Sequence, residues 1–325
     1  MTIDFTKDYY RHADLTGLKA HLAERLDLIE EYPDRQPAEL EALIAQKHGI
    51  QPEGVLLTGG SIEAIHIIAA HYRRYASVIP QPTRREYANA CRIYRHIISY
   101  ENADTLTSLP PNRLYWICNP NSPSGNVLRK GFMDYLVRRS PRYTFVVDQS
   151  YEAYTKEYLL EPCEMKDVAN LLIIHSIDKT YGVPGLRLGY ITGHPSVISL
   201  LREQLRPWPF SSLSLEAGKY LLEQGQPAVT DIDAFLVESE RLRGLLRDIK
   251  GLRVYETKTS YMLCELLDHT TTQLADFLEQ DYGIRIFSCA SYTGLSDHFF
   301  RVASQQPDEN DALVAGITAF LEKPE

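Results

Sequence analysis

The chain has 325 residues, 44% hydrophobic and 24% charged, a composition typical of a soluble globular protein with room for a large and a smaller domain. Its formal net charge of −9 argues against a nucleic-acid-binding surface, but a positive pocket for a small anionic substrate is compatible with it. The five cysteines form no Cys-x-x-Cys pair, and neither a secretory leader nor a membrane-spanning apolar stretch occurs, so we expect a cytoplasmic protein with free thiols and no metal site.

Short apolar segments alternate with helical patterns through the first two thirds of the chain. Helical spacing of apolar residues occurs, for example, at residues 62–75 and 132–139. Strands rich in Val, Ile and Leu on both faces are typical of a mainly parallel sheet that helices cover on both sides. We therefore predict an α/β fold with seven strands in a large domain, at residues 54–57, 77–79, 97–100, 114–118, 144–147, 171–175 and 187–192.

The pattern changes after residues 207–209. A charged helical pattern covers residues 214–250, with a break near 225–227. Short strands are then predicted at 252–255, 261–266, 284–288 and 299–303, with helices near 271–280 and from Glu309. This α+β pattern predicts a smaller C-terminal domain. We assign residues 33–230 to the large domain, and residues 1–32 with 231–325 to the small domain and an N-terminal arm.

The segment from His175 to Tyr190 combines a lysine, several glycines and an arginine between two predicted strands. A lysine in a tight turn after a strand can reach a ligand at the carboxyl edge of a sheet, although a single loop lysine is more often solvated. This segment resembles the Schiff-base motif of the class I and II aminotransferases, which are fold-type I pyridoxal-phosphate enzymes. Ser176 and Lys179 match its Ser-x-x-Lys, and Arg187 ends the Gly-Leu-Arg that follows.

That resemblance implies pyridoxal 5'-phosphate as the cofactor, tethered covalently to Lys179, and a large cofactor-binding domain like that of aspartate aminotransferase. It also implies that Lys179 moves the proton at the substrate's Cα. Ser176 and Arg187 would hold the cofactor phosphate. This role suits an arginine, whose guanidinium binds phosphate through two parallel hydrogen bonds.

The predicted strand at residues 144–147 leads into Asp148-Gln-Ser-Tyr151. A carboxylate at this place can simply cap a turn. The segment resembles the family's Asp-x-x-Tyr, in which the aspartate pairs with the protonated ring nitrogen and so keeps the ring an electron sink. The resemblance therefore assigns that role to Asp148, and to Tyr151 a hydrogen bond to the phenolate oxygen of the ring.

Two turn-rich segments resemble further cofactor contacts. In residues 58–63, glycines between a strand and a helix allow backbone amides to approach a phosphate, although such turns are common. The resemblance makes Gly60, Ser61 and Ile62 phosphate-binding residues. Residues 119–125 resemble the family's Asn-Pro-x-Asn-Pro-Thr-Gly. They place Ser122, next to Asn121, where the family has the asparagine that contacts the ring oxygen.

Two tyrosines fall on further family elements. Tyr32-Pro-Asp matches an element whose tyrosine reaches the cofactor phosphate of the partner subunit, which implies a homodimer with shared active sites. Residues 82–87 resemble the loop that places an aromatic ring over the cofactor, but Arg84 stands at the aromatic position. Either Tyr87 stacks on the cofactor instead or Arg84 covers it, and Tyr87 is otherwise a core residue.

The last candidates concern the substrate. Residues 299–303 resemble the strand whose arginine binds the substrate carboxylate, which points to Arg301 rather than a surface arginine. Arg285 shares a strand face with Phe287 by alternation, where the family often has an arginine, and is our candidate for a second anion contact. Asp178 replaces the usual Ser or Thr beside Lys179, but neighbouring residues of an extended segment point apart, so we expect little effect on the lysine.

The resemblance spans residues 31–320 and is greatest with two branches of the family, the threonine-phosphate decarboxylases of cobalamin biosynthesis and the histidinol-phosphate aminotransferases. Residues 288–295 and Pro184 favour the decarboxylases. The implied reaction is decarboxylation of a small anionic amino-acid phosphate, L-threonine O-3-phosphate, to aminopropanol phosphate, with transamination as the alternative. A binding or regulatory protein that keeps the fold without turnover is a third possibility. A nucleotide-binding dehydrogenase would need Gly-x-Gly-x-x-Gly after the first strand, which is absent.

Overall fold

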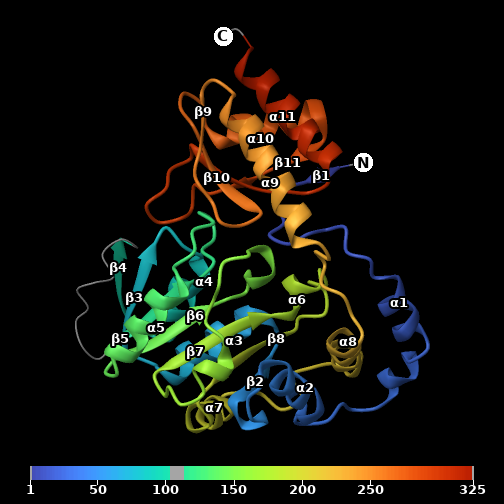
Figure 1. Cartoon of the computed structure of the whole chain (residues 1–325), viewed down its shortest axis with the longest axis vertical. Helices are drawn as coiled ribbons and strands as arrows, with labels where there is room; N and C mark the ends of the chain where they lie inside the picture. Colours follow the sequence, from blue (N-terminus) through green and yellow to red (C-terminus); the bar gives the residue numbers. More distant parts are fainter. Residues whose placement is uncertain (1, 103–112, 324–325) are drawn as a thin grey trace.

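A computed structural model describes residues 2–102 and 113–323 of the chain (Figure 1). Its larger sheet has seven strands in the order β2-β8-β7-β6-β5-β3-β4, and β8 alone among them runs antiparallel to the other six. The mainly parallel seven-stranded sheet predicted from the sequence is thus confirmed. Its strands are β2 (Val55–Thr58), β3 (Ala76–Gln81), β4 (Ile97–Asn102), β5 (Arg113–Cys118), β6 (Thr144–Asp148), β7 (Leu171–Ser176) and β8 (Gly189–Gly193).

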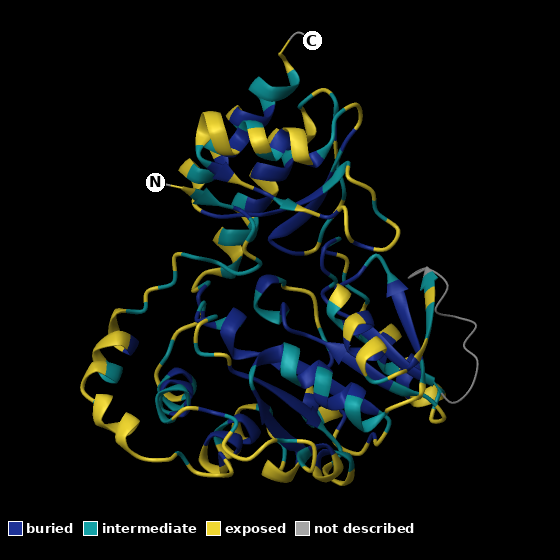
Figure 2. Ribbon diagram, turned by 180° about the vertical axis from the view of Figure 1, so that it is seen from behind, coloured by how far each residue is buried: buried dark blue, intermediate teal, exposed yellow. Residues whose placement is uncertain are grey.

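Helices cover both faces of this sheet, which explains why β7 is buried along its whole length and β5 and β6 along all but their first residue (Figure 2). Alternate residues of one strand enter different cores: Leu56 joins one cluster, and Val55 and Leu57 join another. The first face packs against α3 (Gly60–His71), α4 (Arg85–Ile93) and α7 (Pro195–Arg202). The second face packs against α2 (Ala38–His48), α5 (Lys130–Arg139) and α8 (Ser212–Glu223).

A smaller antiparallel sheet forms a second layer above the large one in Figure 1, in the order β12-β13-β10-β9. Its strands are β9 (Leu252–Val254), β10 (Tyr261–Leu266), β12 (Phe287–Ser288) and β13 (Phe299–Ala303). The core between this sheet and its helices contains residues of α9 (Ile232–Arg247), α10 (Thr271–Phe277) and α11 (Pro307–Leu321). The predicted helical region at 214–250 thus forms two helices, α8 and α9, with a break at the predicted place.

The N-terminal arm connects the two layers. Strand β1 (Ile3–Asp4) pairs in parallel with β11 (Ile284–Arg285), and Phe5 is fully buried in the core of the small sheet. The chain then turns toward the large sheet, where α1 (Thr16–Ala23) packs beside α8. Residues 2–32 therefore contact both layers. The remaining short elements are η1 (Leu26–Glu30), η2 (Pro52–Gly54), η4 (Glu152–Tyr154), η5 (Pro162–Glu164), α6 (Ile177–Thr180) and η6 (Leu278–Tyr282).

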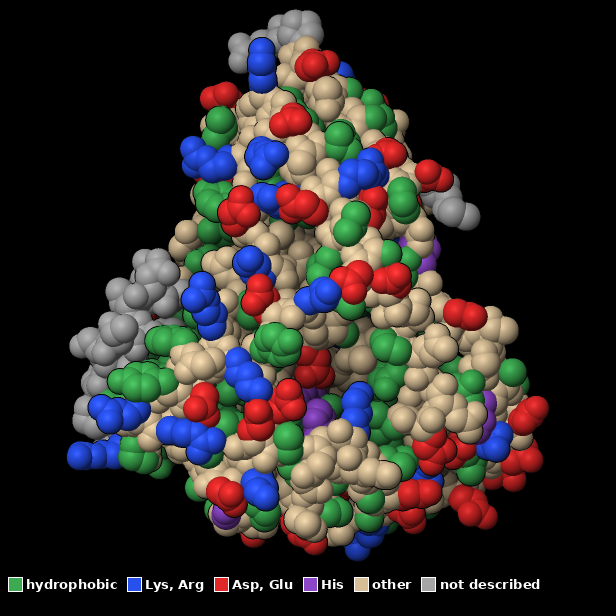
Figure 3. Space-filling model, viewed as in Figure 1, with side chains coloured by type: hydrophobic (Ala, Val, Ile, Leu, Met, Phe, Trp, Pro, Cys, Tyr) green, Lys and Arg blue, Asp and Glu red, His purple; other side chains and the backbone are tan. Residues whose placement is uncertain are grey.

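Several whole-molecule properties complete the description. In the described parts of the chain, no helix is both long and apolar enough to cross a membrane. Within the same residues, no cluster of three or more His, Cys, Asp or Glu side chains is arranged to hold a metal ion. On the face of the molecule shown in Figure 3, basic and acidic side chains are interspersed.

Candidate active site

The predicted site residues gather where the parallel strands end. Strands β5, β6 and β7 are neighbours and end at Cys118, Asp148 and Ser176, so the turns that follow them lie at one edge of the sheet. This edge faces the small sheet, because Arg301 of β13 donates a hydrogen bond to Ser122 in the turn after β5. The candidate site thus lies between the two sheets.

Lys179 lies in the one-turn helix α6, directly after β7. The hydroxyl of Ser176 caps this turn by accepting a hydrogen bond from the Lys179 amide at 3.3 Å. The lysine is only 9% exposed; its Nζ forms an ion pair with Asp8 and lies 4.7 Å from the centroid of the Tyr151 ring. Burial, together with the nearby guanidinium of Arg84, lowers the pKa of the Lys179 ammonium, although Asp8 opposes the shift. A lysine that loses its proton more readily is suited to act as a nucleophile and proton carrier.

Asp148 is the last residue of β6 and is fully buried. Its Oδ2 accepts hydrogen bonds from Nη1 of Arg84 and from the hydroxyl of Tyr87, each at 2.7 Å. Its Oδ1 accepts from the amide of Ser150, at 2.9 Å, and from the Ser150 hydroxyl. The carboxylate therefore has four donors, which matches its acceptor capacity.

The N-terminal arm supplies a carboxylate to the site, which the sequence analysis did not identify. Asp8 accepts a hydrogen bond from the hydroxyl of Tyr151 at 2.8 Å, in addition to its ion pair with Lys179. Burial opposes ionisation, but Lys179 and then Arg301 hold the pKa of Asp8 well below its usual value. The centre of the site thus attracts an anionic group, and in this structure Asp8 occupies that place.

Arg301 lies beside this carboxylate and is almost fully buried. Its Nη1 donates to the Ser122 hydroxyl and its Nη2 to the carbonyl of Thr6, each at 3.1 Å. Its Nε is buried and has no hydrogen-bond partner within residues 2–102 and 113–323. A buried donor without a partner is uncommon, so this guanidinium retains capacity for an anionic ligand.

A cradle formed by backbone amides and an arginine lies at the start of α3. Gly60 has a φ of +79°, and a Cβ at this position would lie 2.6 Å from Nη2 of Arg187, so only glycine leaves this space open. Helix α3 begins here, and the amides of its first turn, including those of Ser61 and Ile62, belong to the free N–H groups of a helix N-terminus. An arginine beside such amides fits the phosphate of the implied cofactor.

Asp178 also belongs to this cradle. Its Oδ2 accepts from Nη1 of Arg187 at 2.6 Å and its Oδ1 from the amide of Leu188 at 2.8 Å. Burial raises the pKa of Asp178 to about 6, although the Leu188 amide and then Arg187 oppose the shift. Asp178 thus pairs with the arginine of the cradle and forms no ion pair with the neighbouring Lys179.

Two predicted residues support the site from the side. Asn121 holds its loop in place by accepting from the Thr83 hydroxyl at 2.7 Å and donating to the carbonyl of Pro82 at 2.9 Å. Tyr87 is buried and stacks on Trp116 with ring centroids 5.6 Å apart, so its ring belongs to the core and its hydroxyl contacts Asp148.

Two predicted residues are not brought into this cluster. Tyr32 is 86% exposed, with its ring 5.4 Å from that of Trp208. Arg285 is half-exposed and forms an ion pair with Glu279 at 2.8 Å. The predicted strand at 284–288 is divided at Ile286, since β11 pairs with β1 and β12 with β13. The role of Arg285 as a second anion contact stays a prediction.

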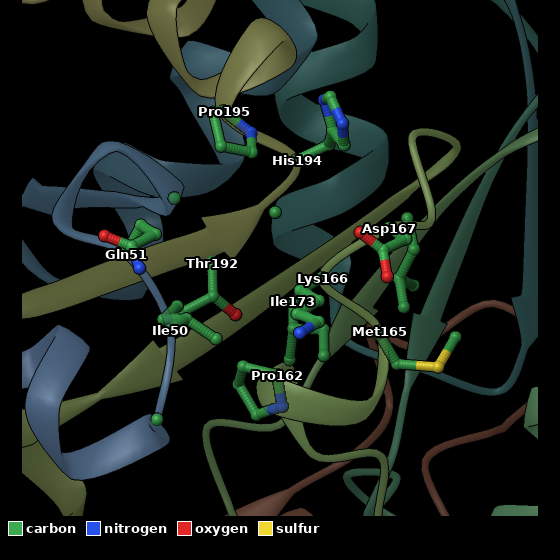
Figure 4. Close-up of a pocket in the computed structure, with 14 residues that line it drawn as sticks. Ile50, Gln51, Pro162, Met165, Lys166, Asp167, Ile173, Thr192, His194 and Pro195 are labelled. Carbon is green, nitrogen blue, oxygen red and sulfur yellow. The ribbon is translucent and has the colours of Figure 1, made fainter.

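A separate cavity of about 300 Å³ lies at the opposite edge of the large sheet, where β8 ends and β7 begins (Figure 4). Ile50, Gln51, Lys166, Asp167 and His194 are among its lining residues, and none of the predicted site residues lines it. The convergence of charged, buried groups, rather than the size of this cavity, identifies the candidate site.

Comparisons with known proteins cover most of the chain. The sequence profile of the family described as aminotransferase class I and II matches residues 10–317. A threonine-phosphate decarboxylase of Salmonella typhimurium is 25% identical, over 98% of this chain and 91% of that protein. Histidinol-phosphate aminotransferase 2 of Haemophilus influenzae is 26% identical, over 93% and 85%. The crystal structure of L-threonine-O-3-phosphate decarboxylase from Porphyromonas gingivalis has a TM-score of 0.95 and 29% identity, covering 99% of this chain and 100% of that chain.

Proposed function

Since the chain belongs to the class I and II aminotransferases, a family that uses pyridoxal 5'-phosphate, we propose that it decarboxylates L-threonine O-3-phosphate to aminopropanol phosphate, a step of cobalamin biosynthesis. The observation that carries this proposal is the full-length likeness to the decarboxylase from Porphyromonas gingivalis. The buried cations of the site support it, because the substrate carries both a carboxylate and a phosphate.

In this proposal each part of the cofactor has a partner in the chain. Lys179 would hold its aldehyde carbon, Asp148 its ring nitrogen and Tyr151 its ring oxygen. The phosphate would lie against Arg187, Ser176 and the amides at the start of α3. The bound cofactor supplies an electron sink for the charge left at Cα when the carboxylate departs as CO2.

The remaining steps fall to side chains of this chain. Arg301 would hold the substrate carboxylate while the bond between Cα and the carboxylate breaks. After CO2 has left, the Nζ of Lys179, in contact with Asp8, would give a proton to Cα, so that one hydrogen of the amine product stands in place of the carboxylate. Asp8 and the ring of Tyr151, which both lie against Lys179, would limit access of water.

The reaction can be tested directly. Purified holoenzyme incubated with L-threonine O-3-phosphate should release CO2 without any keto-acid acceptor. The alternative, transamination, is favoured by the likeness to histidinol-phosphate aminotransferase 2 of Haemophilus influenzae. Amine transfer from histidinol phosphate that depends on an acceptor, without CO2 release, would establish that alternative and reject decarboxylation.

We further propose a homodimer in which Tyr32 contacts the cofactor phosphate of the other subunit. Tyr32 is exposed beside Trp208, and Leu26 and Ile29 in the preceding η1 are exposed as well, which suits an interface. Tyr32→Phe should weaken cofactor binding roughly tenfold through the loss of one hydrogen bond to a charged group, measured by titrating the apoenzyme.

Mixed dimers show whether Tyr32 contacts the cofactor of its own subunit or that of the other subunit. In a dimer of one Tyr32→Phe and one Lys179→Ala subunit, the intact Lys179 lies in the Tyr32→Phe subunit. That site should bind the cofactor with wild-type affinity, because its tyrosine comes from the other chain. Weakened binding at the site that contains Lys179 would show that Tyr32 acts within its own subunit.

Asp178 should make cofactor binding depend on pH. The raised pKa of Asp178, about 6, means that its carboxyl is neutral below that pH and charged above it, where it repels the cofactor phosphate. Relative to Asp178→Ser, the wild-type apoenzyme should lose affinity as pH rises through about 6, with a difference of roughly tenfold at high pH. The affinity is measured by fluorescence titration of both proteins between about pH 5 and pH 8. The cofactor phosphate changes its own charge equally in both series, so the ratio of the two affinities reports on Asp178 alone. Parallel curves would contradict the assignment.

A further inference from the structure

Arg84 is a buried cation that the reaction above does not use. It is 6% exposed. In the loop of residues 82–87 it stands at the position where the family has an aromatic residue. Its Nη1 contacts Asp148 at 2.7 Å, and its Nε lies 3.7 Å from the partly exposed Glu86. Although burial works against the charge, Asp148 keeps the pKa of Arg84 well above its usual value. The side chain therefore carries a permanent charge inside the site.

Cofactor binding would remove the partner of this charge. All four acceptor positions of Asp148 are filled, so a protonated ring nitrogen must replace one of its present donors. Ser150 is fixed two residues along the chain, and Tyr87 is stacked in the core on Trp116. The long side chain of Arg84 is the donor that can move without disturbing the backbone or the core.

A displaced Arg84 would still be buried, and a buried charge is costly without a counter-ion. The anion that enters the site with the cofactor in place is the substrate. We propose that Arg84 binds the phosphate of the substrate while Arg301 binds its carboxylate. This inference rests on the proposed function and deepens it, because it names the residue that selects a phosphorylated amino acid over its unphosphorylated counterpart.

Three observations support this division of roles. The guanidinium of Arg84 lies 5.9 Å from the centroid of the Tyr151 ring, and Nζ of Lys179 lies 4.7 Å from the same ring, so Arg84 borders the reacting centre. Asp8, the carboxylate already held there, is stabilised by Lys179, Arg301 and Arg84 together. Arg285, which the sequence predicted as a second contact for an anionic group of the substrate, forms an ion pair with Glu279 at the surface. An amino acid with two anionic groups therefore meets two arginines in this site.

The first measurement concerns the cofactor alone. Arg84→Gln apoenzyme should bind pyridoxal 5'-phosphate at least as tightly as the wild type, because glutamine does not compete as a cation for Asp148. Fluorescence titration of the apoenzymes gives this affinity. Arg85→Gln is the matched control, since Arg85 is the adjacent arginine and is exposed. A loss of cofactor affinity of tenfold or more in Arg84→Gln alone would overturn the proposal, because Arg84 would then be holding the cofactor.

The second measurement separates the two anionic groups by calorimetry on the holoenzymes. Aminopropanol phosphate carries the phosphate without a carboxylate, and L-threonine carries the carboxylate without a phosphate. Arg84→Gln should weaken binding of aminopropanol phosphate roughly ten- to a hundredfold and leave that of L-threonine unchanged. Arg301→Gln should show the opposite pattern. Arg84→Lys, which keeps the charge, should recover part of the affinity for aminopropanol phosphate.

The outcomes distinguish this inference from the function on which it rests. Unchanged binding of aminopropanol phosphate by Arg84→Gln would overturn the inference and indicate that Glu86 takes up the released guanidinium. Equal losses for both ligands would also overturn it, since they would indicate a general distortion of the site. A wild-type enzyme that does not prefer phosphorylated ligands would reject the proposed function itself, before any variant is compared.

Discussion

Replacement of Lys179 by alanine should reduce turnover by at least roughly 10²–10⁴-fold, the usual contribution of a positioned proton-transfer group, and leave the fold intact. The side chain is buried at the centre of the site, and its Nζ is the group of α6 that contacts Asp8. Alanine removes both the amine that would hold the cofactor and the group that would return a proton to Cα. Borohydride reduction of wild-type holoenzyme followed by peptide mapping should place the cofactor label on Lys179, and the variant should carry no label.

The control for this prediction is Lys258→Ala. Lys258 is an exposed lysine that pairs with Glu157 at 3.7 Å, away from the site residues described above. Its removal should change neither the label nor the rate. A wild-type label on another lysine, or no label at all, would remove the assignment of the cofactor to Lys179.

Replacement of Asp148 by asparagine should slow the reaction by roughly 10- to 100-fold, which corresponds to the loss of one charge-assisted hydrogen bond to the ring nitrogen. It should also destabilise the apoenzyme by about 3–5 kcal/mol, because Arg84 would remain buried without its partner. Rate measurements on holoenzyme and denaturant unfolding of apoenzyme test the two effects separately.

A double variant checks the physical reason. In Asp148→Asn/Arg84→Gln the unpaired charge is absent, so apoenzyme stability should return toward the wild-type value while the rate stays low. The two single variants provide the reference values. If the double variant is less stable than Asp148→Asn alone, the ion pair between Arg84 and Asp148 is not what stabilises this part of the apoenzyme.

The sequence predicted the features that depend on short stretches of chain. Continuous Val, Ile and Leu runs located the strands of the large sheet, because a strand buried on both faces has no polar alternation. The Ser176–Lys179 spacing and the carboxylate at the end of β6 placed two central residues, since parallel strands bring the turns after them together at one edge.

Features that depend on pairing between distant segments were not predictable in this way. Asp8 reaches Lys179 because β1 pairs with β11, a register that no local pattern records. Arg285 forms an ion pair with Glu279 at the surface, and the alternation of residues along a strand does not record that contact. Arg187 contacts Asp178 because the loop after α6 brings the arginine back toward this helix, and the number of residues between the two does not predict that contact.

The pairing of Ile3 with Ile284 also has a consequence for protein synthesis. At about 5–20 residues per second, residue 284 leaves the ribosome roughly 15–60 s after residue 3. All seven strands of the large sheet have been synthesised by Gly193, so that sheet can assemble while β1 still lacks its partner. The arm that carries Asp8 is thus synthesised first, but β1 can pair with β11 only after all strands of the large sheet have been synthesised. In a nascent chain, Lys179 therefore has no cover from a paired arm between the synthesis of Gly193 and that of Ile284.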